Sequence, residues 1–279
     1  METEISSRLA ILGHPQRLAL FRLLMRRYPD HVPAGELASA LGCKASTLSA
    51  YLASLMQAGL VRQTRDGTSR LYAIDMTQVG RTLDYLMLDC CRGRPDLCSP
   101  FSKDEGVRHV PQTKFKVLFI CTGNSARSIL AESILRREGG DRFEAYSAGT
   151  RARSELNPVA LEVLAQKGHD VSMLRAKNIA EFQGAGAPTF DFVFTVCNRA
   201  ANEDCPAWQG QPVSAHWGMP DPVAVEGTAA EKSLAFHHAY GALLNRIKTF
   251  TALPIETLDR ISLQRAVDDI AQVGRGVSA

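Results

Sequence analysis

The sequence predicts a mainly α-helical winged helix-turn-helix domain followed by an α/β domain with a parallel sheet. The length of 279 residues exceeds the usual size of one domain, and a hydrophobic content of 45% suffices for two cores. Short helical patterns and a hairpin signal fill the first third, whereas strand and helix patterns alternate after residue 114. We therefore expect a domain over 1–98, a linker over 99–114, a second domain over 115–253 and a helical tail over 254–279.

Four closely spaced helical patterns open the chain, over 4–12, 15–27, 35–41 and 46–58. Gly42 separates the last two patterns, Ser46 is the expected N-cap of the fourth, and Gly59 ends it. A short turn between two such helices is typical of a helix-turn-helix, whose second helix can enter the major groove of DNA.

A hairpin signal follows the fourth helix. Strand patterns over 60–65 and 69–74 flank Asp66-Gly67, a dipeptide typical of tight turns, and a helical pattern over 77–91 closes the domain. The side chains expected to contact bases or phosphates are Lys44, Ser46, Thr47, Ser49, Tyr51, Arg62, Arg65 and Arg70. A helix-turn-helix that only packs is the alternative, since a formal charge of +3 does not identify a nucleic-acid binder.

Seven cysteines, no signal peptide and no membrane-spanning stretch indicate a cytoplasmic protein whose thiols serve as metal ligands or redox catalysts. Cys90, Cys91 and Cys98 surround an expected helix end at Gly93, where they can converge on one ion. Three thiolates without histidine or carboxylate suit As(III) better than four-coordinate zinc. Unused surface thiols, a redox switch and a zinc site are the alternatives. Cys43 is interpreted as a packing residue, with a fourth ligand as the lesser alternative.

The first third resembles the ArsR-type winged-helix repressors of arsenical resistance in LGHPQRLALFRLL, ELASALGCKASTLSAYLASLMQAGLV and RQTRDGTSRLY. The resemblance covers 5–98. It implies a homodimer built from the first and last helices, which reads a pseudo-palindromic operator and dissociates when a metalloid binds. Family members often carry cysteines in the helix before the recognition helix, but residues 32–38 contain none. Members with a cysteine pair near the last helix point to the later thiol cluster as the As(III) inducer site.

After residue 114, strand patterns over 115–120, 143–147 and 190–196 alternate with helical patterns over 128–138 and 158–167. Functional loops of such domains lie at the C-terminal ends of parallel strands. Cys121 and Cys197 each follow a strand directly, so we expect two thiols side by side. Cys205 follows a loop expected over 198–204, which could deliver it to Cys197. The tail packs on this domain or extends a dimer interface, and the sequence does not choose.

The segment KVLFICTGNSARS over 116–128 predicts a site for a tetrahedral oxyanion. An apolar strand leads to Cys121, and a small loop follows that ends in Arg127 at a helix start. Loop amides and the helix N-terminus favour an anion, and the same field predicts a Cys121 pKa below that of a free cysteine. A buried structural cysteine is the alternative. The expected oxyanion ligands are Thr122, Gly123, Asn124, Ser125, Ala126 and Arg127.

The motifs VLFICTGNSARSILAE, YSAGT, FDFVFTVCNRAANEDCP and AHWGMPDPVAVEG together resemble arsenate reductases of the low-molecular-weight tyrosine phosphatase fold, over 114–253. The resemblance implies the nucleophile Cys121, the oxyanion ligand Arg127, its neighbour Ser128 as a hydroxyl partner of the thiolate, the general acid Asp221, and the resolving thiols Cys197 and Cys205. A turn-forming aspartate before Pro222 is the alternative for Asp221. His216 is expected to hold the Asp221 loop.

The resemblance implies a thiol-disulfide relay that reduces arsenate to arsenite without a bound cofactor. Thioredoxin is the implied external reductant, and glutaredoxin or a low-molecular-weight thiol is the alternative. Eight positions separate Cys197 from Cys205, slightly more than in the best-known members, so the reach of the loop and the choice of reductant stay open.

These patterns predict a fused arsenic-responsive repressor and arsenate reductase, in which one domain makes the ligand that the other senses. One alternative is a tyrosine phosphatase fused to a regulator, which leaves Cys197 and Cys205 without a role. The other is a regulator whose second domain is a non-catalytic oxyanion or redox sensor. The operator sequence, induction by Sb(III) and coupling between the domains are left open by the sequence.

Overall fold

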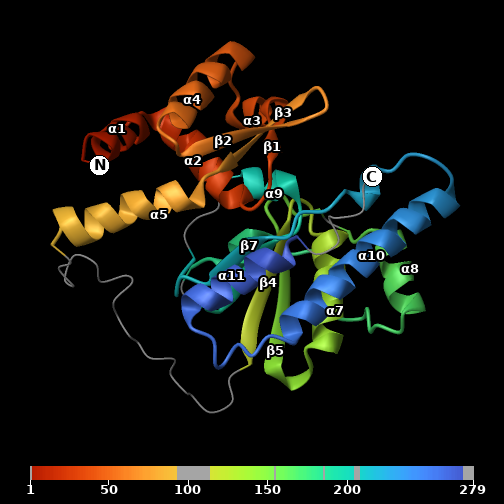
Figure 1. Cartoon of the computed structure of the whole chain (residues 1–279). Coiled ribbons are helices and arrows are strands. Elements are labelled where there is room, and N and C mark those ends of the chain that lie inside the picture. The colour runs from red at the N-terminus through yellow and green to blue at the C-terminus, as the bar shows by residue number, and fades with distance from the viewer. Residues whose placement is uncertain (1, 93–113, 154, 185, 204–207, 273–279) are drawn as a thin grey trace. The chain divides into compact units, whose positions relative to one another are not determined.

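The computed structural model describes residues 2–92, 114–153, 155–184, 186–203 and 208–272 (Figure 1). The chain forms two compact units, Met1–Gln112 and Thr113–Ala279. Among the described residues, no helix is both long and apolar enough to cross a membrane.

The N-terminal unit is mainly helical and carries a small antiparallel sheet of order β1-β3-β2. Its elements are α1 (Glu2–Leu12), α2 (Pro15–Arg27), β1 (Val32–Pro33), α3 (Ala34–Leu41), α4 (Ala45–Gln57), β2 (Val61–Asp66), β3 (Ser69–Ile74), α5 (Met76–Asp84) and a π-helical turn η1 (Tyr85–Cys90). Leucines of α2 and α4, among them Leu20, Leu24, Leu48 and Leu52, form the centre of its core. The predicted winged helix-turn-helix is confirmed, and the two-residue strand β1 is an addition to it.

The turn between α3 and α4 follows the expected glycine. Gly42 ends α3 in the left-handed conformation with φ of 62°. The prediction of Ser46 as N-cap is wrong, because Lys44 occupies that position without a side-chain cap and α4 begins at Ala45. The serine before the regularly spaced leucines of α4 was therefore too weak a signal to locate the first turn of this helix.

A buried arginine joins the first helix to the last ones of this unit. Arg8 is only 3% exposed, and its guanidinium donates to the carbonyl of Ala58 at 2.9 Å, to Oγ1 of Thr82 at 3.2 Å and to Oε1 of Gln78 at 2.7 Å. A buried guanidinium is tolerated only where its donors find acceptors. Arg8 therefore fixes α1 against α4 and α5, a role that the sequence pattern did not reveal.

The C-terminal unit contains a four-stranded parallel sheet of order β5-β4-β6-β7, which confirms the predicted α/β class. Its strands are β4 (Phe115–Cys121), β5 (Phe143–Gly149), β6 (Phe192–Thr195) and β7 (Val213–His216). Its helices are α7 (Arg127–Glu138), α8 (Pro158–Gln166), α9 (Asn198–Asn202), α10 (Ala229–Thr251) and α11 (Arg260–Ile270), with short 3₁₀ turns η2 (Gly140–Arg142), η3 (Ile179–Phe182) and η4 (Pro222–Ala224).

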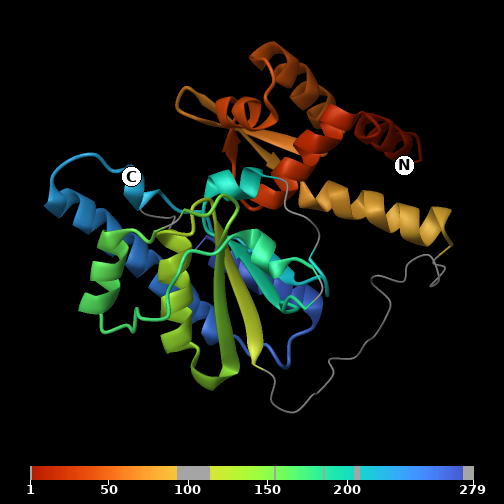
Figure 2. The same cartoon turned by 180° about the vertical axis from the view of Figure 1, so that it is seen from behind.

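Helices α7 and α10 pack against each other, α7 also contacts β4 and β5, and α11 contacts β7 and α10; Figure 2 shows the same unit from behind. The structure therefore decides the place of the tail. Leu263, Val267 and Ile270 of α11 are buried in the core of the C-terminal unit. Strand β7 and helix α10 were not predicted, although Thr228 and Glu231 form a capping box at the start of α10 that could have located it.

Glycine is required where β5 ends beside the loop that follows β4. Gly149 pairs with Cys121 in the parallel register. A Cβ at Gly149 would lie 2.7 Å from the carbonyl oxygen of Thr122 and 2.9 Å from the amide nitrogen of Asn124. Both contacts are with backbone, which cannot move aside without deforming the loop.

We predict that Gly149→Ala lowers the free energy of unfolding of the C-terminal unit by about 1–3 kcal/mol, because the added methyl group overpacks the loop. Gly241→Ala is the matched control, since nothing lies within 4 Å of its added Cβ in the middle of α10. There alanine should stabilise the helix by about 1 kcal/mol. Urea unfolding followed by tryptophan fluorescence measures both changes. Equal stabilities for Gly149→Ala and the parent would contradict the argument.

Candidate active site

Cys121 is the last residue of β4, and the loop from Cys121 to Arg127, here called the oxyanion loop, connects it to α7. The thiol is 3% exposed. The backbone N–H of Asn124 donates to Sγ of Cys121 at 3.1 Å, and Oγ of Ser128 lies 2.9 Å from the same sulfur. The thiol is therefore contacted both by the loop and by the first turn of α7.

Asn124 holds the shape of the oxyanion loop. Its φ of 45° is left-handed, a conformation that asparagine adopts more readily than other non-glycine residues. Its side-chain nitrogen donates to Oγ of Ser128 and of Ser147, both at 2.8 Å, and its side-chain oxygen accepts from the backbone N–H of Lys177 at 2.7 Å. Asn124 is fully buried, so these bonds are sheltered from water.

A buried ion pair lies behind the loop. Glu132 of α7 is 1% exposed and accepts from Ser147 at 2.5 Å, from Nζ of Lys177 at 2.9 Å and from Arg136 at 2.5 Å. Both carboxylate oxygens of Glu132 therefore accept hydrogen bonds, as a buried charge requires. The sequence analysis missed Ser147, Lys177 and Glu132, although a glutamate inside the apolar run of 129–135 was a visible signal of a buried polar network.

The pKa of the Cys121 thiol is raised first by burial and then by the neighbouring Cys197, whereas the hydrogen bonds of Ser128 and the charge of Arg127 lower it. The raising causes prevail, in contrast to the lowered pKa expected from the sequence. The physical reason is that burial removes the water that would stabilise the charged thiolate.

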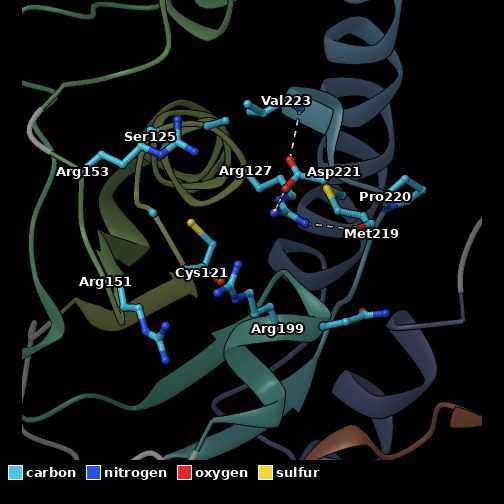
Figure 3. A pocket seen from close by; sticks show the side chains of 14 residues that line it. Cys121, Ser125, Arg127, Arg151, Arg153, Arg199, Met219, Pro220, Asp221 and Val223 are labelled. Atoms are coloured by element: carbon cyan, nitrogen blue, oxygen red, sulfur yellow. Dashed lines mark hydrogen bonds and ion pairs between the residues drawn. The ribbon is translucent and has the colours of Figure 1, made fainter. Parts of the chain in front are cut away.

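Arg127 is paired with the carboxylate of Asp221. An Arg127 Nη atom lies 2.7 Å from Oδ2 of Asp221, and Oδ1 of Asp221 accepts from the backbone N–H of Val223 at 3.1 Å (Figure 3). Asp221 is 41% exposed and Arg127 only 12% exposed. Asp221 is thus the start of a turn and also pairs with Arg127 of the oxyanion loop, and its role as general acid stays a prediction.

The Asp221 loop is anchored from behind by the C-terminal helices. Arg246 of α10 is buried and donates to the carbonyls of Trp217 at 2.8 Å and of Ala271 at 3.4 Å. The indole N–H of Trp217 donates to the carbonyl of Val267 in α11 at 3.1 Å, and its ring stacks on Phe194 at 4.1 Å. The tail therefore fixes the segment that leads to Asp221.

Cys197 follows β6, which pairs in parallel with β4, so the predicted neighbourhood of the two strand ends is confirmed. Cys197 is the N-cap of α9, and its Sγ accepts from the N–H of Ala200 at 3.4 Å and lies 3.4 Å from Oγ1 of Thr122. The prediction of a loop over 198–204 is wrong at its start, because Asn198–Asn202 is helical. Cys205 lies outside the described residues.

His216 was expected to hold the Asp221 loop, but the hydrogen bonds of its ring hold the segment around Cys197. Its ring nitrogens lie 2.7 Å from Oγ1 of Thr195 and 3.2 Å from Oδ1 of Asn198, and the side chain is 1% exposed. A Cβ at Gly218 would collide with this ring, so the glycine permits the close packing.

The expected oxyanion ligands Thr122, Gly123, Ser125, Ala126 and Arg127 line one pocket together with Cys121 and Asp221, and the cavity measures about 410 Å³. Asn124 shapes the loop from below without lining the pocket. Figure 3 also shows Arg151, Arg153 and Arg199 around the thiol, and the sequence analysis assigned no role to these three arginines.

On the N-terminal unit, the DNA-contact candidates Lys44, Ser46, Ser49, Arg62, Arg65 and Arg70 are exposed, and Thr47 is half-buried. Tyr51 was expected to contact DNA, but it is half-buried because its ring packs on the core and lies 5.5 Å from the ring of His14. It is therefore better placed to support α4 than to reach a base.

The proposed inducer thiols are only partly described. Cys90 is exposed at the end of the π-helical turn and Cys91 is half-buried after it, whereas Cys98 lies outside the described residues. Cys43 packs against the core of its unit, as interpreted from the sequence. Within the described ranges, no group of three or more metal-binding side chains occurs.

A buried cysteine in an anion-binding loop between a parallel strand and a helix defines a class of enzymes that act on tetrahedral oxyanions through a thiolate. A family model described as low molecular weight phosphotyrosine protein phosphatase matches residues 116–261, and a helix-turn-helix domain model matches 12–64.

An arsenate reductase from Halalkalibacterium halodurans is 37% identical over 134 residues, which are 48% of this chain and 93% of that protein. One from Bacillus subtilis is 36% identical over 134 residues, with the same shares. A solved structure described as an ArsR-like transcriptional regulator from Rhodococcus sp. RHA1 covers 36% of this chain and 91% of that chain, with 20% identity and a TM-score of 0.30.

The chain belongs to the low molecular weight phosphotyrosine protein phosphatase family and carries a helix-turn-helix domain ahead of the family domain. The resemblance to the arsenate reductases of this fold, inferred from the motifs, is confirmed by these relatives.

Because the hydrogen bonds of Ser128 lower the pKa of Cys121, we predict that Ser128→Ala raises that pKa further. The thiolate fraction at neutral pH then falls, so alkylation by iodoacetamide slows at pH 7 and its pH–rate profile moves to higher pH. Ser133→Ala is the control, since Ser133 lies on the same helix but bonds to His169. An unchanged profile for Ser128→Ala would show that this hydroxyl does not stabilise the thiolate.

Proposed function

We propose that the C-terminal unit reduces arsenate to arsenite by a relay of Cys121, Cys197 and Cys205, and that the N-terminal unit is an arsenic-responsive repressor. The observation that carries the reductase proposal is the buried Cys197 thiol beside Thr122 of the oxyanion loop. A second thiol at this place can donate electrons to a substrate bound at Cys121, whereas phosphate hydrolysis does not need one.

The first half of the proposed reaction takes place in the oxyanion loop. Arsenate is held by the loop amides and by Arg127, which exchanges Asp221 for the anion. The Cys121 thiolate attacks arsenic, and the hydroxyl group of hydrogen arsenate, which receives one proton from Asp221 as general acid, leaves as water. A Cys121 thioarsenate adduct results.

The second half moves two electrons from sulfur to arsenic. The Cys197 thiolate attacks Sγ of Cys121, the bond from sulfur to arsenic breaks, and its electron pair stays on arsenic, which departs as arsenite. Cys205 then attacks the Cys197 sulfur of the resulting disulfide and releases Cys121. The remaining Cys197–Cys205 disulfide is reduced by an external dithiol, for which we propose thioredoxin.

The proposal is tested with purified protein, arsenate, thioredoxin, thioredoxin reductase and NADPH. We predict that Cys121→Ser abolishes NADPH consumption, and that Cys205→Ser releases about one arsenite per chain and traps a Cys121–Cys197 disulfide, because only the second exchange is lost. Cys43→Ser should turn over like the parent. Sustained thioredoxin-coupled turnover by Cys205→Ser refutes this thiol order, and absence of arsenate reduction by the parent leaves the phosphatase or sensor alternatives.

The repressor proposal rests on the helix-turn-helix, on the exposed basic wing and on the thiols that follow α5. Apolar side chains are exposed on α1 and near the end of the unit, with Leu9 at 40%, Leu83 at 51% and Leu88 at 70%. Exposed leucines on the first and last helices support a homodimer formed by them. Such a dimer would bring the α4 helices of two protomers to a two-fold symmetric operator.

We predict that As(III) releases operator DNA from the parent and that a Cys90→Ser, Cys91→Ser double variant stays bound while it still reduces arsenate. As(III) shifts the DNA-bound population only if it binds the released conformation more tightly, with a typical coupling of about 5- to 150-fold. Fluorescence anisotropy at one fixed salt concentration measures operator affinity. Cys43→Ser is the matched control. If the double variant releases operator DNA at the same arsenite concentration as the parent, this cluster is not the inducer site.

A further inference from the structure

Three arginines, Arg151, Arg153 and Arg199, surround the mouth of the pocket and are here called the rim arginines (Figure 3). The oxyanion loop and Arg127 already supply the donors that a tetrahedral anion needs. The rim arginines are exposed. Because most arginines of a protein are exposed, exposure alone does not indicate a function, and their contacts with the site must be considered.

Backbone hydrogen bonds fix the segment that carries two of them to the oxyanion loop. The N–H groups of Thr150, Arg151 and Arg153 donate to the carbonyls of Cys121, Thr122 and Gly123 at 3.1, 2.8 and 2.9 Å respectively. The segment thus supplies hydrogen-bond donors to three carbonyl groups of the oxyanion loop. The backbone positions of Arg151 and Arg153 are therefore fixed by hydrogen bonds to the oxyanion loop.

The side chains of Arg153 and Arg199 bring positive charge close to the oxyanion loop and to Cys197. The Cγ and Nε atoms of Arg153 lie 3.5 Å from the place of a Cβ on Gly123, so this side chain lies against the loop. Arg199 belongs to α9, whose N-cap is Cys197, and its side chain lines the same pocket.

Nearby carboxylates neutralise only part of this charge. Asp221 balances Arg127 at 2.7 Å, and Glu203 faces Arg151 at 3.5 Å. Among the residues that the structure describes, Arg153 and Arg199 are in no ion pair. The mouth therefore carries an excess of positive charge on the path that an anion takes to Cys121.

We infer that the rim arginines, above all Arg153 and Arg199, steer dianionic tetrahedral oxyanions to Cys121 and favour them over anions of lower charge. The inference deepens the proposed function by naming what selects its substrate, and so rests on it. Two guanidinium groups that line the pocket raise the local concentration of a dianion, and salt screens the effect over about 8–10 Å. Steering acts on capture, so it changes kcat/KM and leaves kcat at saturation unchanged.

Charged and neutral alkylating agents test the steering without any turnover. We expect the ratio of Cys121 alkylation by iodoacetate to that by iodoacetamide to fall roughly two- to fivefold at low salt for Arg153→Gln and for Arg199→Gln, and further for the double variant. The ratio cancels changes in the thiolate fraction, because both reagents need the same thiolate. Half-molar sodium chloride should remove the difference. Arg265→Gln, an exposed arginine on α11 outside the pocket, is the control and should keep the parent ratio.

A double variant with the parent ratio at low salt overturns the inference, whatever the outcome with arsenate. In the coupled reductase assay, the double variant should raise KM for arsenate at an unchanged kcat, and its kcat/KM should depend less on salt than that of the parent. A lowered kcat with an unchanged KM would instead assign these arginines to the chemical steps and also overturn steering. If the parent reduces no arsenate, the proposed function fails while the alkylation ratio still decides whether the rim attracts anions.

Discussion

The parallel pairing of β4 with β5 and β6 is the constraint on which the active-site geometry depends. Because the three strands run in one direction, their C-terminal ends meet at one edge of the sheet. From β4 comes Cys121, the proposed nucleophile. From β5 comes Gly149, which leaves room for the loop, and β6 leads to Cys197. A change of register in either pair would separate groups that must lie within a few ångströms of one another.

The site is built from charges that are satisfied before substrate arrives. Behind the loop, Glu132 and Lys177 form a buried pair that supports Asn124 through Ser147. At its front, Asp221 pairs with Arg127. In the proposed reaction arsenate replaces Asp221 on Arg127, and this costs little because one hydrogen-bonded anion replaces another and no buried charge is left unpaired.

The helices at the C-terminus have a more specific task than adding core. Arg246 and Val267 bind the backbone and indole of Trp217, the residue from which the chain continues to Asp221. The general acid proposed for the reaction is thus held by elements from the far end of the chain. In the N-terminal unit the buried Arg8 has a comparable role, since it fixes the first helix against α5, the helix that precedes Cys90 and Cys91.

The sequence alone determined the elements whose signals are local. The apolar strand before Cys121, the glycines that end helices and the Asp66-Gly67 turn predicted both domains, since these signals depend on nearest neighbours in the chain. The position of each cysteine directly after a parallel strand also predicted that Cys197 lies beside Cys121. The tertiary structure alone decided the position of α11, the partners of Asn124 and the engagement of Arg127 by Asp221, a residue 94 positions away. It also reversed the expected pKa shift of Cys121, because desolvation depends on how completely distant segments cover the thiol, which no local pattern records.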